Sequence, residues 1–206
     1  MKVILINGSP NEHGCTYTAL NECAGALNAN GVGSEIIWLG NKPLASCISC
    51  RKCKQTGKCV FPDIVNEAAA KIEAADGLIV GSPVHYSGPS GQIVTFMNRL
   101  FFSASSRFAG KPAASVVSCR RGGATATFEQ LNQFFGISKM PVVSSQYWNQ
   151  VHGNTPAEVL QDAEGLQTMR TLAQNMAWLI KCIEAGKRAG VERPVCEPTT
   201  PTNFIR

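Results

Sequence analysis

The sequence is poor in charged and aromatic side chains and contains no long apolar run. Charged residues make up 16% of its 206 residues, aromatic residues 7% and hydrophobic residues 44%. This composition is typical of a folded α/β domain with one core, and it excludes a disordered chain. No uninterrupted apolar stretch reaches the length of about 18 residues that marks a transmembrane helix. We therefore expect no membrane partner.

A long basic stripe and a signal peptide are also missing. The formal net charge is +5, and the only cluster of basic residues is Arg51, Lys52, Lys54 and Lys58. Proteins that bind nucleic acid usually show a longer stripe or a recognisable module, so we expect no nucleic-acid partner. The chain opens with a single Lys before a strand pattern, which favours a cytoplasmic protein. In that compartment nine cysteines indicate metal, cluster or redox chemistry rather than structural disulfides.

The first eighteen residues predict a phosphate cradle. Residues 2–7 form an apolar strand pattern, residues 8–16 a loop of Gly, Ser and Thr, and a helix pattern follows. Free backbone N–H groups and the helix dipole favour an anion there, and Ser9 and Thr16 add hydroxyl donors. The loop has neither the Gly-Lys-Ser/Thr of a nucleotide triphosphate loop nor a G-x-G-x-x-G pattern. A monophosphate such as that of FMN fits best, and an ordinary capped turn is the alternative.

Strand and helix patterns alternate along the chain. Strands are expected at 2–7, 34–40, 78–81, 113–118 and 141–145, and helices at 16–30, from Asp63 onward, at 93–101, at 125–135 and at 166–183. This alternation predicts a parallel sheet with helices on both faces and ligands beyond the carboxyl ends of the strands. We assign residues 1–190 to one domain. Residues 191–206 are expected to form an irregular tail containing Pro, a candidate arm on a partner subunit.

Three loops at that predicted edge have unusual compositions. The loop at 82–91 combines Pro, Gly and hydroxyl residues with Tyr86, which can stack on a flat ring or cover the core. Arg120 and Arg121 suit an electron-rich ring edge or a nicotinamide cofactor phosphate, with solvated arginines as the alternative. The segment at 147–153 suits a pocket lid or an oligomer interface.

Four cysteines are grouped as Cys47-x2-Cys50-x2-Cys53-x5-Cys59. Three cysteines at a spacing of three can converge on one small volume, and a fourth can complete an iron–sulfur site. The spacing differs from the ferredoxin run and from the two knuckles of a tetrahedral zinc site. Iron–sulfur, unmetallated thiols and zinc all stay open. The neighbouring basic residues would offset the charge of a four-thiolate cluster.

Taken together, these motifs resemble the flavodoxin-like NAD(P)H-dependent FMN reductases. The matching residues are 7–10 with 14–16, 81–86 with 90–91, and 120–123; the cysteines resemble the iron–sulfur flavoprotein branch. The resemblance covers about residues 1–185. It implies a doubly wound, five-stranded parallel sheet of order 2-1-3-4-5, bound FMN, and a homodimer or homotetramer.

The resemblance also implies roles for individual residues. The FMN phosphate would be surrounded by Ser9, Asn11, Cys15, Thr16 and Tyr17, and the ring lined by Pro83, Val84, His85, Tyr86, Ser87 and Gly88 with Arg120, Arg121, Gly122 and Gly123. Cys47, Cys50, Cys53 and Cys59 would hold a [4Fe–4S] cluster. Two departures weaken the match, because the family often has Arg where Asn11 stands and Asn or Ser where Cys15 stands.

The expected activity is that of an FMN-dependent oxidoreductase, passing electrons from NAD(P)H to a quinone, a flavin or another small acceptor. No catalytic side chain is expected, because the flavin supplies the chemistry. One alternative is an iron–sulfur flavoprotein electron carrier that takes its electrons from ferredoxin. Another is a non-catalytic redox sensor that binds flavin or metal.

Overall fold

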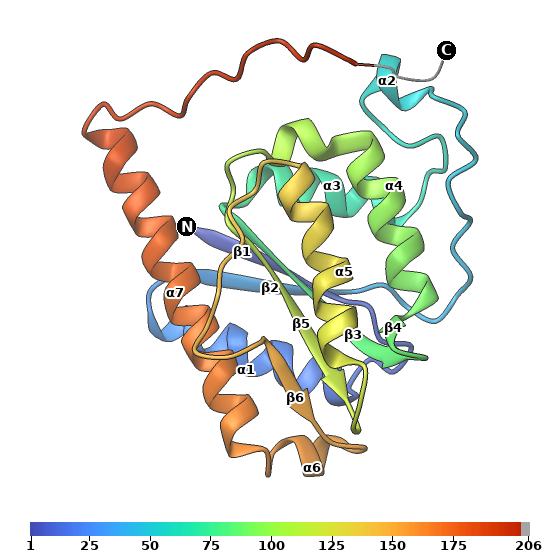
Figure 1. Ribbon diagram of the computed structural model, residues 1–206, viewed down its shortest axis with the longest axis vertical. Coiled ribbons are helices and arrows are strands. Elements are labelled where there is room, and N and C mark those ends of the chain that lie inside the picture. Colours follow the sequence, from blue (N-terminus) through green and yellow to red (C-terminus); the bar gives the residue numbers. More distant parts are fainter. Residues whose placement is uncertain (203–206) are drawn as a thin grey trace.

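The computed structural model describes residues 1–202, which contain a parallel sheet at the centre of the molecule (Figure 1). Its strands lie in the order β2-β1-β3-β5-β6, and the two-residue β4 pairs antiparallel with β3. This confirms the predicted 2-1-3-4-5 arrangement, with β5 and β6 as the fourth and fifth parallel strands. The strands are β1 (Lys2–Asn7), β2 (Gly33–Trp38), β3 (Gly77–His85), β4 (Gly88–Pro89), β5 (Ala113–Cys119) and β6 (Gln150–His152).

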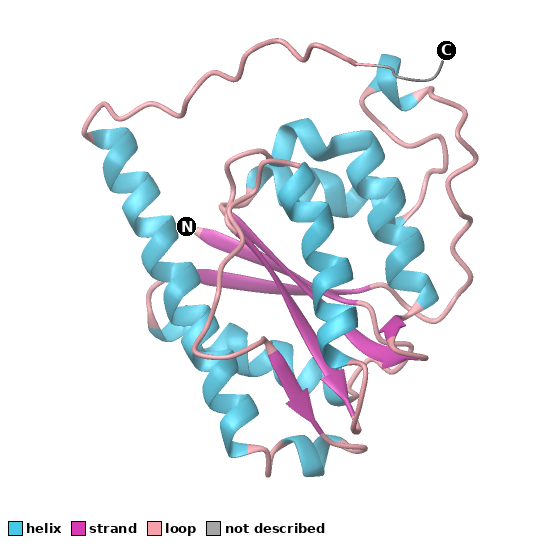
Figure 2. Ribbon diagram, in the orientation of Figure 1, coloured by secondary structure: helices cyan, strands magenta, loops and turns pink. Residues whose placement is uncertain are grey.

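Helices cover both faces of the sheet (Figure 2). One face packs against α3 (Ile64–Ala74), α4 (Gly91–Phe108) and α5 (Ala124–Ile137), and the other against α1 (Cys15–Ala29) and α7 (Ala163–Arg188). The alternation along β1 sets this division, because Ile4 and Ile6 join the first cluster while Val3 and Leu5 join the second. The short helix α6 (Pro156–Val159) adds Val159 to the second cluster, whereas α2 (Cys53–Thr56) has no buried residue. Among residues 1–202, none of the helices combines the length and the hydropathy that crossing a membrane requires.

The fifth parallel strand is displaced from its predicted position. Within 141–145 only Val142 bridges β5, at Ala113, and the regular strand is β6 at 150–152. The apolar pair Val142–Val143 suggested a strand, but local bonds turn the chain away from the sheet. Ser145 Oγ bonds the backbone of Tyr147, and Asn175 of α7 donates to the Ser144 carbonyl. Such side-chain bonds to the backbone compete with the strand ladder.

The third strand is longer than predicted. It was expected to end at Gly81, but β3 continues to His85, where a two-residue turn leads into β4. Tyr86 and Ser87 form that turn with φ of +50° and +61°. A two-residue hairpin turn with two left-handed residues matches the twist of the strands that it joins. The loop at 82–91 is therefore a stiff hairpin rather than an irregular loop.

The chain after α7 crosses the end of the molecule opposite the carboxyl ends of the strands and approaches α2 (Figure 1). Residues 191–202 form neither helix nor strand. The Arg193 guanidinium donates to the Ala109 carbonyl, next to Gly110. This contact fastens the start of the tail to the turn between α4 and β5.

Candidate functional site

The loops after β1, β3 and β5 meet at one edge of the sheet. Gly8 N–H donates to the Gly81 carbonyl at 2.9 Å, and Ser90 Oγ donates to the Gly8 carbonyl at 2.7 Å. Gly123, with φ of +89°, lies so close to the hairpin that a Cβ there would stand 2.7 Å from the Ser87 Cα. The structure thus brings the three loops predicted to bind FMN into direct contact.

The predicted phosphate loop is held in shape by its own side chains. The buried Asn7 donates to the Glu12 carbonyl at 2.8 Å and accepts from Ser9 N–H at 3.1 Å. Ser9 Oγ accepts from Asn11 N–H at 3.1 Å, and Trp38 Nε1 donates to the Ser9 carbonyl at 2.8 Å. The loop is therefore ordered before a ligand arrives, which lowers the entropy lost on binding.

Two long helices begin at this edge without a side-chain cap. In the described chain, α1 starts after Gly14 and α5 after Gly123, and neither first turn receives a side-chain bond. The other long helices are capped, α3 by Asp63, α4 by Ser90 and α7 by Asp162. The first-turn N–H groups of α1 and α5 are left for an external acceptor, and the helix dipoles favour an anion. The residues at α1 therefore fit the phosphate of FMN.

The side chains predicted around the phosphate differ in how they face this turn. Asn11 is exposed, Cys15 and Tyr17 are half-buried, and Thr16 is buried with Oγ1 3.2 Å from Ser118 Oγ. The Tyr17 ring packs edge-on against His13 at 4.8 Å between centroids. Burial raises the pKa of the Cys15 thiol, so this residue adds no negative charge beside the phosphate position at neutral pH.

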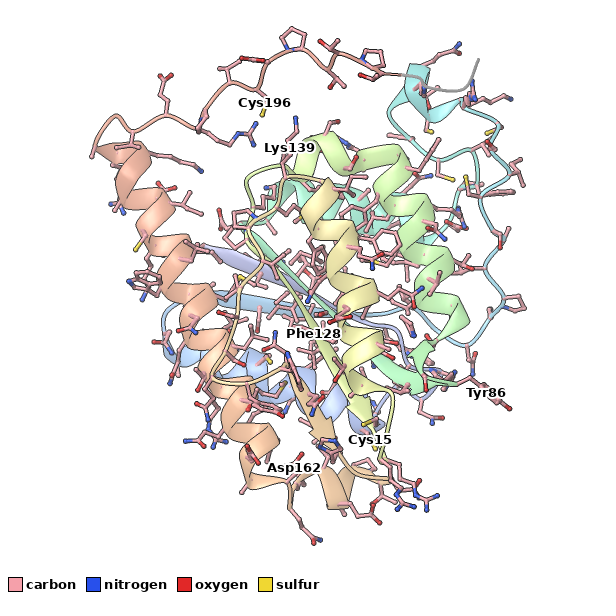
Figure 3. The ribbon with its side chains drawn as sticks, viewed as in Figure 1. Cys15, Tyr86, Phe128, Lys139, Asp162 and Cys196 are labelled. Atoms are coloured by element: carbon pink, nitrogen blue, oxygen red, sulfur yellow. The ribbon has the colours of Figure 1, made fainter. Side chains whose placement is uncertain are left out.

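The residues predicted to line the ring lie on the hairpin and on the loop that follows β5. Pro83, Val84 and Gly88 are half-buried, and His85, Tyr86 and Ser87 are exposed. Tyr86 projects into solvent at the same end of the molecule as Cys15 (Figure 3). It does not cover the core, which removes that alternative. Arg120, Arg121 and Gly122 are exposed as well, and Gly123 is half-buried against the hairpin.

Asn149 and Gln150 at the start of β6 were not predicted as site residues. Asn149 is 1% exposed, and its amide nitrogen and oxygen have no partner within residues 1–202. Gln150 Oε1 is also buried and unpartnered there. A sequence signal existed, because two consecutive amides directly precede an apolar strand residue, Val151. Buried polar atoms of this kind are normally satisfied by a ligand or by water.

The cysteines lie on a long segment that follows β2 and runs along α4. Gln92 donates to the Leu39 and Lys42 carbonyls at 3.3 Å, and Arg107 donates to the Gly57 carbonyl at 3.0 Å. All four cysteines line one small surface hollow with a cavity volume of about 20 Å³, together with Arg99 of α4. Within residues 1–202, however, no three ligand side chains stand close enough to hold a metal ion. The sulfurs would have to move inward around a cluster.

The backbone of this segment changes hand between the second and third cysteines. Ser49 and Arg51 have left-handed φ of +53° and +58°, and Lys52 returns to the right-handed region. Successive residues of opposite hand turn their N–H groups toward one point, as at many iron–sulfur sites. The kind and number of donors and this backbone fit a four-thiolate cluster.

Arg99 is a further residue that sequence reasoning missed. It is fully buried on α4, donates to Cys59 Sγ at 3.3 Å and forms two bonds with Asp63 at 2.8 and 2.9 Å. The signal was an arginine within the apolar pattern of this helix, three residues after Phe96. A charge at such a position requires buried partners.

Comparisons with known proteins agree with this geometry. The sequence profile of the family described as NADPH-dependent FMN reductase matches residues 1–155. An iron-sulfur flavoprotein of Methanocaldococcus jannaschii is 36% identical over 194 residues, covering 89% of this chain and 100% of that protein. Another, from Methanosarcina thermophila, is 27% identical over 192 residues, covering 91% and 99%. A solved flavodoxin from the domain Archaea has a TM-score of 0.61 at 15% identity, covering 88% of this chain and 99% of that one, which confirms the flavodoxin-like fold.

Proposed function

The chain belongs to the NADPH-dependent FMN reductase family and is a flavin oxidoreductase, and from that premise we propose that it uses FMN to pass electrons from NAD(P)H to a quinone, a flavin or another small acceptor. The observation that carries this proposal is the pair of uncapped helix starts at one edge of the sheet, beside an ordered loop of neutral donors. The edge offers N–H groups for a phosphate at α1 and for a ring edge at α5.

The phosphate of FMN would be held by the N–H groups at the start of α1 together with Ser9 and Asn11. The ring would lie between the hairpin at 83–88 and the loop at 120–123, which touch through Gly123. When bound, FMN supplies hydride and single-electron transfer. The hairpin would orient the ring. Arg120 and Arg121 would place positive charge near the ring edge that accepts from the N–H groups at the start of α5.

Binding of matched ligands tests the phosphate assignment. We expect FMN to bind at least tenfold more tightly than riboflavin, which has the same ring and no phosphate, because the α1 contacts all go to the phosphate. Fluorescence quenching of the flavin gives both dissociation constants. Equal affinities would remove the phosphate from α1.

Anaerobic oxidation of NADH and NADPH with a quinone acceptor tests turnover, and a protein that binds FMN without turnover would be the redox sensor.

A second candidate function is an iron–sulfur flavoprotein that receives its electrons from ferredoxin. The hollow lined by Cys47, Cys50, Cys53 and Cys59 favours it, as do the names of the relatives. These thiolates would hold a [4Fe–4S] cluster, which supplies single-electron transfer. We expect about four irons per chain after anaerobic preparation. Cys50→Ala should abolish iron binding and leave FMN bound, whereas Cys182→Ala, at an exposed helix position, should keep both.

Electron donors separate the two candidates. Reduced ferredoxin and NAD(P)H are supplied in turn to the anaerobic protein, and flavin reduction is followed in the visible spectrum. Reduction by ferredoxin alone supports the electron carrier. Protein that contains no iron and still oxidises NAD(P)H at full rate would support the plain reductase and exclude the cluster.

A further inference from the structure

Arg99 lies beneath the cysteine hollow, where α4 meets the cysteine segment and the start of α3. Its side chain has no exposed surface, although it carries a permanent charge. Removing such a charge from water is unfavourable by several kcal/mol unless nearly every donor finds an acceptor. The partners of Arg99 therefore reveal what the charge is used for.

The guanidinium divides its donors between a carboxylate and the cysteine segment. Nη1 and Nη2 donate to the two carboxylate oxygens of Asp63, and the flat face lies over the Phe61 ring at 4.8 Å. The Nε proton is left for Cys59 Sγ at 3.3 Å. Because the ion pair with Asp63 fixes the plane of the group, the Nε–H direction is fixed as well.

The same guanidinium holds both ends of the cysteine segment. Nη1 also donates to the Ala45 carbonyl at 3.2 Å, two residues before Cys47, while Nε reaches Cys59, the last of the four cysteines. The cations of the segment itself, Arg51, Lys52, Lys54 and Lys58, are all exposed and can exchange their bonds with water. Arg99 offers a sulfur contact that water does not replace.

We propose that Arg99 positions Cys59 as a cluster ligand and, through its Nε–H bond to the sulfur, raises the reduction potential of the cluster. The inference rests on the proposed cluster at the four cysteines. A hydrogen bond to a ligand sulfur stabilises negative charge, and the reduced cluster carries one more electron than the oxidised one. The bond therefore favours the reduced form. The bonds to Ala45 and Asp63 explain why the donor cannot turn away from the sulfur.

The test compares cluster potentials in arginine variants. Arg99→Met removes the donor, and Arg99→Lys keeps the charge but loses the planar fork and the Nε donor. Arg107→Met is the matched control, because Arg107 lies two turns further along α4 and bonds the Gly57 carbonyl rather than a sulfur. Each protein is loaded anaerobically with iron and sulfide. The reduction potential of the cluster is then measured by a redox titration, in which electron paramagnetic resonance detects the reduced cluster. We expect both Arg99 variants to shift to lower potential, with FMN affinity and the Arg107→Met potential unchanged.

Each remaining outcome decides between the hypotheses. Loss of iron from folded, FMN-bound Arg99→Met, with iron retained in Arg107→Met, would support the positioning role. An unchanged cluster potential in loaded Arg99→Lys and Arg99→Met would overturn the proposed role of Arg99 and leave the proposed cluster standing. Wild-type protein that binds no iron would overturn both. If Arg99→Met does not fold, wild-type protein with ¹⁵N-labelled arginine tests the Nε–H bond to Cys59 directly. Absence of magnetic coupling between the reduced cluster and an arginine nitrogen would refute that bond.

Discussion

Thr16 lies in the first turn of α1, and its hydroxyl is buried beside the hydroxyl of Ser118. The Ser118 hydroxyl can donate to Thr16 Oγ1, which leaves the Thr16 proton free for a phosphate oxygen. We predict that Thr16→Val loses one charge-assisted bond, about 1.5–3 kcal/mol, and weakens FMN binding about ten- to a hundredfold. Flavin fluorescence titration measures the change.

Thr18→Val is the matched control for this prediction. The Thr18 hydroxyl donates its proton to the carbonyl of Gly14, the residue before α1, so that proton is not available to a phosphate. Its loss should leave FMN affinity within about twofold. An unchanged dissociation constant in Thr16→Val would remove the Thr16 hydroxyl from the site, and equal losses in both variants would point to the helix start rather than to a direct contact.

Single residues were predictable where their partners are near in sequence. A helix was expected from Asp63 onward, and the structure shows this side chain as its cap, accepting from Val65 N–H at 3.1 Å. Arg99 was not predicted, because its acceptors lie 36, 40 and 54 residues away. Periodicity marks an arginine on a buried face but does not say which distant carboxylate or sulfur meets it. The roles of the FMN residues stay predictions, although the structure brings them together.

The junction of α3 and α4 depends on one carboxylate. Asp63 both caps α3 and pairs with the buried Arg99 of α4. We predict that Asp63→Ala lowers the free energy of unfolding by about 3–5 kcal/mol, because it leaves a buried charge unpaired and a helix uncapped. Asp63→Asn keeps the cap and one acceptor and should lose clearly less. Urea denaturation followed by circular dichroism measures both, and equal losses would show that the ion pair matters and the cap does not.

Elements were predictable from apolar runs where packing and local chemistry agree. β1, β3 and β5 lie close to their predicted positions because their side chains are buried between helices on both faces. The edge strand β2 also lies close to its predicted position, with half-buried side chains that pack against both core clusters. The fifth strand was misplaced because serine side-chain bonds near Ser144 and Ser145 outweigh the preference of Val142–Val143. The length of β3 was underestimated because a turn made by Tyr86 and Ser87 carries no glycine at its left-handed positions.

At the scale of the whole molecule, large aromatic side chains are exposed on α7 and on the segment before β6. Trp178 is 66% exposed, Tyr147 53% and Trp148 47%. Aromatic residues in such numbers mark protein interfaces. We predict at least a homodimer in solution. Light scattering that gives 22.0 kDa at micromolar concentration would contradict it. Trp178→Glu should weaken the assembly, whereas Lys181→Glu, exposed on the same helix, should change it less.

The four cysteines contribute little to the core. Both core clusters are built from the sheet and its helices, and only Cys59 of the four packs against one of them. We therefore predict that removing a cluster with a chelator leaves the circular dichroism spectrum and FMN affinity unchanged and shifts the melting temperature by only a few degrees. This differs from zinc fingers, which unfold without metal. Loss of cooperative unfolding in the iron-free protein would contradict the prediction.

The cysteine segment lies on the outside of α4, and this position has a consequence for how the protein matures. A ligand loop that packs over a finished helix can receive its metal after the sheet has formed. If the four cysteines hold the proposed cluster, chains made during iron shortage would still fold and take up flavin, and would accept the cluster when iron and sulfide return. Such chains would form a reserve that iron supply alone converts to the complete electron-transfer protein, without new synthesis.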